Sequence, residues 1–142
     1  MPARQQNETA NHMYPRESAW LDGLLLLYVA ASLLHFVHNA EYLADYPNLP
    51  AWLDRADVYL AWLGLAAIGA AGWALYRFGW RLAGLLLIGV YAGFGFDGLL
   101  HYTRAPFAAH TQAMNFTIWF EVAAAALLLL AVLTLVARRP AK

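Results

Sequence analysis

Four long apolar stretches dominate the pattern of hydrophobic and polar positions along the chain. They cover about residues 20–39, 56–76, 82–102 and 109–136. Each is close to the length of about twenty apolar residues that a helix needs to cross a bilayer. Prolines and polar residues interrupt the pattern at 45–50 and 103–106, where a helix cannot easily continue. The pattern therefore predicts an all-α integral membrane protein with four transmembrane helices.

The short connections predict an up-down-up-down four-helix bundle, because consecutive helices joined by short loops lie antiparallel. Residues 1–17 are expected to form a polar N-terminal tail, residues 18–138 the four-helix domain, and residues 139–142 a basic C-terminal tail. In this topology two basic residues, Arg55 and Arg104, lie on one side. Seven lie on the other: Arg4, Arg16, Arg77, Arg81, Arg138, Arg139 and Lys142. Because cytoplasmic loops are enriched in Lys and Arg, both termini are predicted to be cytoplasmic, in a cell membrane that would be the inner one in a bacterium.

The composition agrees with a membrane location and narrows the chemistry. Apolar residues make up 62% of the 142 residues and charged residues only 13%, too few to cover a soluble fold. The formal net charge is zero, so no bulk field attracts nucleic acid. There is no cysteine, which excludes disulfides, thiolate metal sites and iron–sulfur clusters. Any metal would be held by imidazole and oxygen.

Ionisable side chains within the apolar stretches gather at one end of the predicted bundle. The first stretch ends in His35-Phe36-Val37-His38-Asn39-Ala40-Glu41-Tyr42, which carries two imidazoles, an amide and a carboxylate. Asp97 and His101 end the third stretch, and His110 and Glu121 lie toward the start of the fourth. In an antiparallel bundle all of these ends lie on the non-cytoplasmic side. Because ionisable groups are costly inside a bilayer, such a cluster indicates function.

A divalent transition metal is the leading expectation for this cluster. The favoured ligands are His35, His38, Asp97, His101 and Glu121. Imidazole and carboxylate without sulfur suit zinc, iron, manganese or copper(II). The groups expected to orient these ligands are Asn39, Glu41, Tyr42 and His110. The spacing His-x-x-His-x-x-Glu departs from the Glu-x-x-His of di-iron bundles, so a mononuclear site is favoured. The hypothesis is a metal-dependent membrane enzyme or a metal-handling protein, with Glu121 and Asp97 as catalytic acid and base.

Other functions fit the same residues. A b-type haem held between His35 and His101 would make an electron carrier. Without a cofactor, buried imidazole and carboxyl groups act as general acid and base on a lipid-soluble substrate, as in an isomerase or cyclase, or carry protons or an ion. Transport through only four helices would require a homo-oligomer. The chain is also compatible with an accessory subunit of a larger membrane complex.

Several of these residues also have a purely structural interpretation. Residues that fit the headgroup region, where polar groups are tolerated, are His38, Glu41, Tyr42, Tyr102 and His110. Asp54 and Asp57 are placed to cap the second helix, since acidic side chains favour a helix N-terminus. His35 could join helices through a hydrogen bond to Asp97 or Glu121. A structural interpretation is hardest to sustain for those two acids.

Helical periodicity predicts two faces that point into the bundle. A stripe on the third helix, spaced by four and expected to allow close helix approach, consists of Gly89, Gly93, Asp97 and His101. One face of the fourth helix, also expected to point inward, consists of His110, Met114, Thr117 and Glu121.

Overall fold

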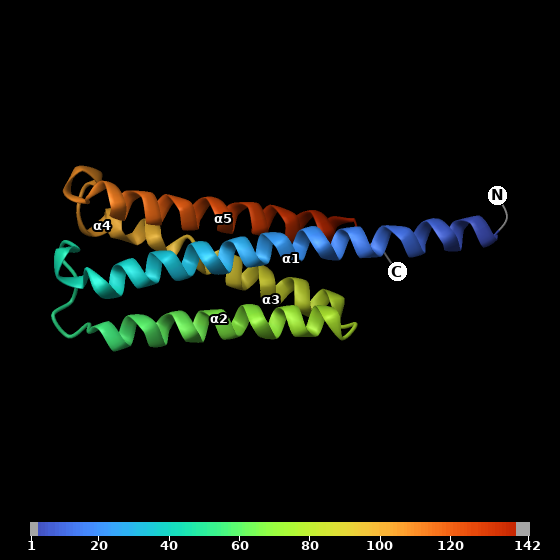
Figure 1. Cartoon of the computed structure of the whole chain (residues 1–142), viewed down its shortest axis with the longest axis horizontal. Coiled ribbons are helices and arrows are strands. Elements are labelled where there is room, and N and C mark those ends of the chain that lie inside the picture. The colour runs from blue at the N-terminus through green and yellow to red at the C-terminus, as the bar shows by residue number, and fades with distance from the viewer. Residues whose placement is uncertain (1–2, 139–142) are drawn as a thin grey trace.

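The structure, a computed structural model, consists of helices joined by short connections (Figure 1). It describes the backbone of residues 3–138 and the side chains of residues 19–138. The long helices are α1 (Ala3–Glu41), α2 (Arg55–Arg77), α3 (Arg81–Phe94) and α5 (Gln112–Ala137). The shorter ones are η1 (Leu43–Asp45), η2 (Asp97–Leu100), α4 (His101–Arg104) and η3 (Phe107–Ala109). No strand occurs within residues 3–138.

The prediction of an all-helical chain with four membrane-spanning segments is confirmed at the level of length and composition. The segments long and apolar enough to cross a bilayer are Ala19–Glu41, Arg55–Arg77, Arg81–Arg104 and Gln112–Ala137. The helix α1 begins at Ala3, so the polar segment expected to be an N-terminal tail is part of this helix. The expected basic tail, residues 139–142, lies outside the described residues.

Side-chain caps fix where two of the long helices begin. At the start of α2 the Asp57 backbone N–H donates to Asp54 Oδ1 at 2.9 Å, and the Asp54 N–H donates to Asp57 Oδ2 at 3.1 Å. This reciprocal pair confirms the capping role expected for both aspartates. At the start of α5 the Met114 N–H donates to Thr111 Oγ1 at 3.2 Å. The cap places the first residue of α5 at Gln112, slightly later than expected.

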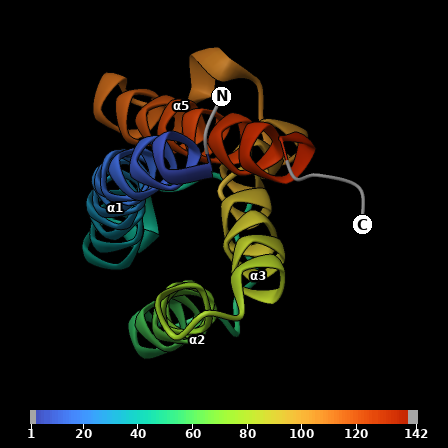
Figure 2. The ribbon, with the colours of Figure 1, turned by 90° about the vertical axis from the view of Figure 1, so that its right-hand side faces the viewer.

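The connections between the long helices alternate between the two ends of the molecule. In Figure 1 the loop after α1 and the connection from α4 to α5 lie at the left, and the turn from α2 to α3 lies at the right. Seen from the end, α1, α3 and α5 lie together, and α2 stands to one side and packs mainly on α3 (Figure 2). The core of the bundle therefore lies between α1, α3 and α5.

The contact between α2 and α3 is tight in the half of the bundle near their turn, whereas a groove lined by Leu26, Ala66 and Trp73 lies between α1 and α2 in the same half. Leu21, Leu85 and Leu128 are almost completely buried there. The backbones of α2 and α3 touch in this half, because a Cβ atom added to Gly84 would overlap the backbone of Tyr76. The sequence placed close approach at Gly89 and Gly93. A Cβ on Gly89 would lie 3.3 Å from Val132 Cγ1 of α5, so a close contact is present there, but a Cβ at Gly93 would meet nothing within 4 Å.

The third span is broken near the opposite end, which corrects the expectation of one continuous helix. The α-helix α3 ends at Phe94, and a 3-10 turn, η2, follows before α4. A Cβ on Gly95, at the break, would lie 2.5 Å from the Ala125 Cβ and 2.7 Å from Tyr28 Cε2, so the chain passes very close to α5 and α1 here. Because a 3-10 turn advances about 120° per residue instead of about 100°, Asp97 leaves the expected stripe. It is exposed, and the neighbouring Gly98 is buried instead.

Candidate functional site

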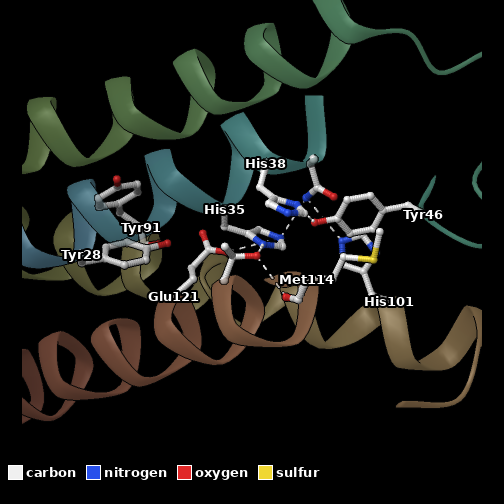
Figure 3. A network of polar contacts seen from close by, with 10 residues as sticks. Tyr28, His35, His38, Tyr46, Tyr91, His101, Met114 and Glu121 are labelled. Atoms are coloured by element: carbon white, nitrogen blue, oxygen red, sulfur yellow. Dashed lines mark hydrogen bonds and ion pairs between the residues drawn. The ribbon is translucent and has the colours of Figure 1, made fainter. Parts of the chain in front are cut away.

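A buried imidazole and a buried carboxyl meet at the centre of the polar half of the bundle (Figure 3). His35 on α1 and Glu121 on α5 are each 2% exposed, and His35 Nε2 lies 3.7 Å from Glu121 Oε2. The two side chains come from segments far apart in the sequence. Their convergence is the geometry on which the predicted site depended.

Hydrogen bonds from Asn39 and Thr117 fix the orientation and the tautomer of His35. Asn39 Nδ2, which is a donor, lies 2.9 Å from His35 Nε2, so Nε2 accepts. His35 Nδ1 then carries the hydrogen and donates to Thr117 Oγ1 at 3.3 Å. The Thr117 hydroxyl donates in turn to the Met114 carbonyl oxygen at 3.0 Å. The network assigns His35 as a neutral imidazole with its hydrogen on Nδ1.

The same asparagine links His35 to a second imidazole. Asn39 Nδ2 lies 3.5 Å from His101 Nε2, and the rings of His35 and His101 are 5.5 Å apart at 79°. Tyr46, from the loop after α1, places its ring 5.0 Å from the His101 ring. The predicted association of α1 and the end of the third span is thus present, through Asn39.

Tyr46 closes the outer end of this network. It is 4% exposed, and its hydroxyl lies 2.9 Å from His38 Nδ1. Burial raises the pKa of Tyr46 to about 12, so the phenol stays protonated and can donate to His38. The sequence analysis did not assign Tyr46 to the site. The signal for its role was its position in a Pro-containing turn directly after the His-rich end of the first span.

Three other predicted site residues, Glu41, Tyr42 and His110, lie around this network. Glu41 is exposed, accepts a hydrogen bond from the Tyr59 hydroxyl at 2.7 Å and pairs with Arg55 at 3.0 Å, so it joins α1 to α2. Tyr42 is exposed and stacks on His38 with ring centroids 4.7 Å apart.

His110 is buried beside Tyr102 and 6.2 Å from the His101 ring, with its Nδ1 3.1 Å from the Pro106 carbonyl oxygen. The inward-facing side of α5 is confirmed, since Met114, Thr117 and Glu121 are all buried.

Polar side chains continue one to two turns deeper than sequence reasoning placed them. Tyr28 and Ser32 on α1 are 1% exposed, and Tyr91 on α3 is fully buried. The Tyr28 hydroxyl donates to the Tyr91 carbonyl oxygen at 3.1 Å, and the Tyr91 hydroxyl has no hydrogen-bond partner among the side chains that the structure describes. Because Tyr and Ser are common in apolar helices, the sequence alone did not separate these from lipid-facing residues.

A cavity of about 220 Å³ lies against the network. Its polar wall includes His35, Asn39, His101 and Glu121, and its apolar wall includes Phe36 and Phe94. The remaining lining residues come from the loop after α1 and from the helices around it: Leu43, Leu49, Leu53, Asp57, Val58, Ala61, Asp97 and Gly98. An apolar chamber with a few convergent polar groups is the usual form of a small-molecule site.

The arrangement of the donors bears on the cofactor hypotheses. Among the described residues, no group of three or more His, Asp or Glu side chains is arranged to hold one metal ion. His35 Nε2 faces an amide nitrogen, and His38 Nδ1 faces a phenol. For haem, the Asn39 side chain lies against both imidazole nitrogens that would bind the iron. Metal and haem binding therefore stay predictions.

Comparisons with known proteins add no assignment to this geometry. No family model matches the chain, and no curated protein or solved structure matches it. The site has to be interpreted from its own residues.

Proposed function

We propose that this chain is a membrane-embedded acid/base enzyme that shifts a proton on a lipid-soluble small molecule, with Glu121 and His35 as the reacting pair. The observation that carries the proposal is a carboxyl and an imidazole, both 2% exposed and 3.7 Å apart, at the wall of a largely apolar cavity. Groups that are expensive to bury in a bilayer are retained where they act. Their position gives a substrate dissolved in the lipid access to proton transfer away from bulk water.

The orientation of the bundle is part of this proposal. We place the four spans in up-down-up-down order with both termini on the cytoplasmic side. The alternating connections in Figure 1 and the seven-to-two distribution of Lys and Arg support this placement. The cavity then opens toward the non-cytoplasmic side of a cell membrane, where the loop after α1 and the α4–α5 connection lie.

An isomerisation suits this pair of groups because it needs no co-reactant. One group removes a proton from a substrate carbon, the double bond moves, and the other group delivers a proton to a second carbon, so atoms and charge balance. Asn39 and Thr117 hold His35 with Nε2 3.7 Å from Glu121 Oε2. For the proton to return between the two groups, Nε2 releases the Asn39 N–H and accepts from the Glu121 carboxyl. Asn39 and Thr117 are positioning residues in this scheme.

Deuterium transfer from solvent tests the proposal. Purified full-length protein in nanodiscs is incubated in D2O with a total lipid extract, and lipid masses are followed by mass spectrometry. Wild type is expected to introduce deuterium into one lipid class, and Glu121→Gln to slow this by roughly 100-fold or more. Glu41→Gln, which alters an exposed carboxylate paired with Arg55, should match wild type. If no lipid gains deuterium, or if Glu121→Gln behaves like Glu41→Gln, the proposal fails.

The same preparation separates the alternatives. Elemental analysis of protein extracted without chelator would favour the metal hypothesis if it found one transition metal per chain that His35→Ala and His101→Ala both remove. An absorption band of haem would favour the electron carrier. Co-purification with larger membrane proteins, together with no activity alone, would favour an accessory subunit.

A further inference from the structure

The cavity wall carries acidic groups and no basic ones. Asp57, Asp97 and Glu121 all line it, and none of its described lining residues is Lys or Arg. His35 in the wall is held as a neutral imidazole by Asn39 and Thr117, so it adds no positive charge. The electrostatic potential of the chamber therefore favours a positively charged occupant.

Asp97 stands out among these acids because it has no partner. It lies within the third candidate span, seven residues before the end of that span at Arg104. It makes no hydrogen bond or ion pair with any residue that the structure describes. By contrast, Asp57 Oδ2 accepts the Asp54 backbone N–H of the α2 cap. A carboxylate at this depth in a bilayer requires a counter-charge or a proton, and residues 19–138, whose side chains the structure describes, provide no counter-charge for Asp97.

A second, independent observation is a buried hydrogen-bond acceptor on a residue that lines the same chamber. Asn39 lines the cavity and is 8% exposed. Its amide nitrogen is engaged with His35 and His101, but its carbonyl oxygen Oδ1 is buried without any hydrogen-bond partner. Buried acceptors are nearly always satisfied in folded proteins, so a small rotation of the Asn39 amide toward the chamber would let an N–H group of an occupant complete this site.

We propose that the natural occupant of the cavity is a hydrophobic amine, bound as its protonated ammonium form. Its N–H donates to Asn39 Oδ1, and Asp97 supplies the counter-charge. Its hydrocarbon part lies on the leucines and phenylalanines of the apolar wall, and Phe36 and Phe94 add aromatic faces that favour a cation. A neutral lipid would leave Asp97 without a partner, and an anionic one would be repelled. The inference rests on the proposed function only in taking the amine as the substrate of the proposed enzyme. The amine site itself does not depend on that function.

Two probes of the same shape isolate the charge. N,N-dimethylbenzylamine is a protonated amine near neutral pH, and isobutylbenzene is its carbon isostere. Binding of each to full-length protein in phosphatidylcholine nanodiscs is measured by equilibrium dialysis, with empty nanodiscs subtracted. Wild type is expected to prefer the amine by roughly tenfold, the scale of one nearby counter-charge. Asp97→Asn should abolish this preference and leave isobutylbenzene binding unchanged.

A matched control and a second variant keep the test decisive. Asp45→Asn removes an exposed carboxylate from the same end of the molecule but outside the cavity, and should keep the preference. If Asp97→Asn does not fold, Asn39→Leu replaces it and should reduce amine binding by several-fold. Equal binding of both probes to wild type, or an equal loss in Asp97→Asn and Asp45→Asn, overturns the inference.

The outcome is separable from that of the proposed function. Amine preference without any deuterium transfer rejects the enzyme and retains the amine site. Deuterium transfer into a neutral lipid without amine preference retains the enzyme and rejects the amine site.

Discussion

Asp22 and Asp97 lie in opposite halves of the bundle and differ in whether a described residue pairs with them. Near the α2–α3 turn, Asp22 accepts a hydrogen bond from Trp73 Nε1 at 3.0 Å and pairs with Arg77 at 3.6 Å. In the other half, Asp97 lines a cavity and pairs with none of the described residues. Asp22 is thus paired within the chain, whereas Asp97 and the buried Asn39 Oδ1 have no partner among the described residues. On this basis we propose that the first half holds the helices together and the second binds a ligand.

Packing follows the same division. In the tight half, α2 and α3 approach until their backbones touch at Gly72 and Gly84. In the polar half, α3 ends at Phe94, η2 takes Asp97 out of the helical register of α3, and a cavity of about 220 Å³, which Asp97 lines, stays between the helices. Functional sites commonly cost stability that the rest of the fold supplies. The comparison predicts that substitutions in the tight half affect mainly stability and those in the polar half mainly chemistry.

The largest expected effect is on the tight half. Gly84→Ala would push a methyl group into the backbone of α2 and should lower the free energy of unfolding by about 3 kcal/mol. Gly64→Ala is the control, because its added methyl would meet nothing within 4 Å, and should change stability by less than about 1 kcal/mol. Unfolding in mixed micelles measures both. Similar losses of stability in the two variants would show that the close contact between α2 and α3 does not stabilise this half of the bundle.

The next effect concerns alkaline pH at the outer end of the network. Burial raises the pKa of Tyr46 from its ordinary value of 10 to about 12. An unfolded chain releases the phenol proton at lower pH than the folded one, so the stability is complete below pH 10 and falls as pH rises toward 12. At about 1.4 kcal/mol per unit, the loss is about 2 to 3 kcal/mol. Unfolding curves of wild type should therefore fall more steeply over this pH range than those of Tyr46→Phe. Parallel curves would show that Tyr46 is accessible to water.

Asn39→Leu should have a smaller effect on stability but should change the tautomer of His35. The substitution removes the donor to His35 Nε2 and to His101 Nε2 and should cost about 1 to 2 kcal/mol. Nitrogen-15 NMR should show the His35 hydrogen on Nδ1 in wild type and a mixture of tautomers in the variant. An unchanged spectrum would mean that Asn39 does not set the tautomer.

The smallest effect is expected at the exposed ion pair between α1 and α2. Glu41→Gln removes the Glu41–Arg55 contact, whose side chains are 38% and 65% exposed, and should change the free energy of unfolding by less than about 1 kcal/mol. Deuterium transfer should not change. A large loss of activity would bring Glu41 into the site, as the sequence first suggested.

The sequence predicted the spans well because twenty apolar residues in a row have few other structures available. It also placed the inward face of α5, since Met114, Thr117 and Glu121 follow helical periodicity within an unbroken helix. The site residues of the third span could not be placed in the same way. The break after Phe94 depends on how closely Gly95 passes Tyr28 and Ala125, which is a tertiary contact and leaves no local signal.

Residues outside the spans were also hard to assign. Tyr46 reaches the network because the loop after α1 folds back over His38 and His101, a path that spacing along the chain does not specify. His35 and His38 lie three residues apart on α1, a spacing typical of metal ligands on one helix. In the structure, however, Asn39 and Tyr46 face their ring nitrogens.

The most direct measurement is the rate at which solvent deuterium enters membrane lipid in the presence of wild type, Glu121→Gln and Glu41→Gln. If Glu121 and His35 are a reacting pair, wild type and Glu41→Gln transfer deuterium at the same rate and Glu121→Gln is slower by roughly 100-fold. If all three rates equal that of empty nanodiscs, the buried pair only holds α1 to α5, and the account of the polar half is wrong.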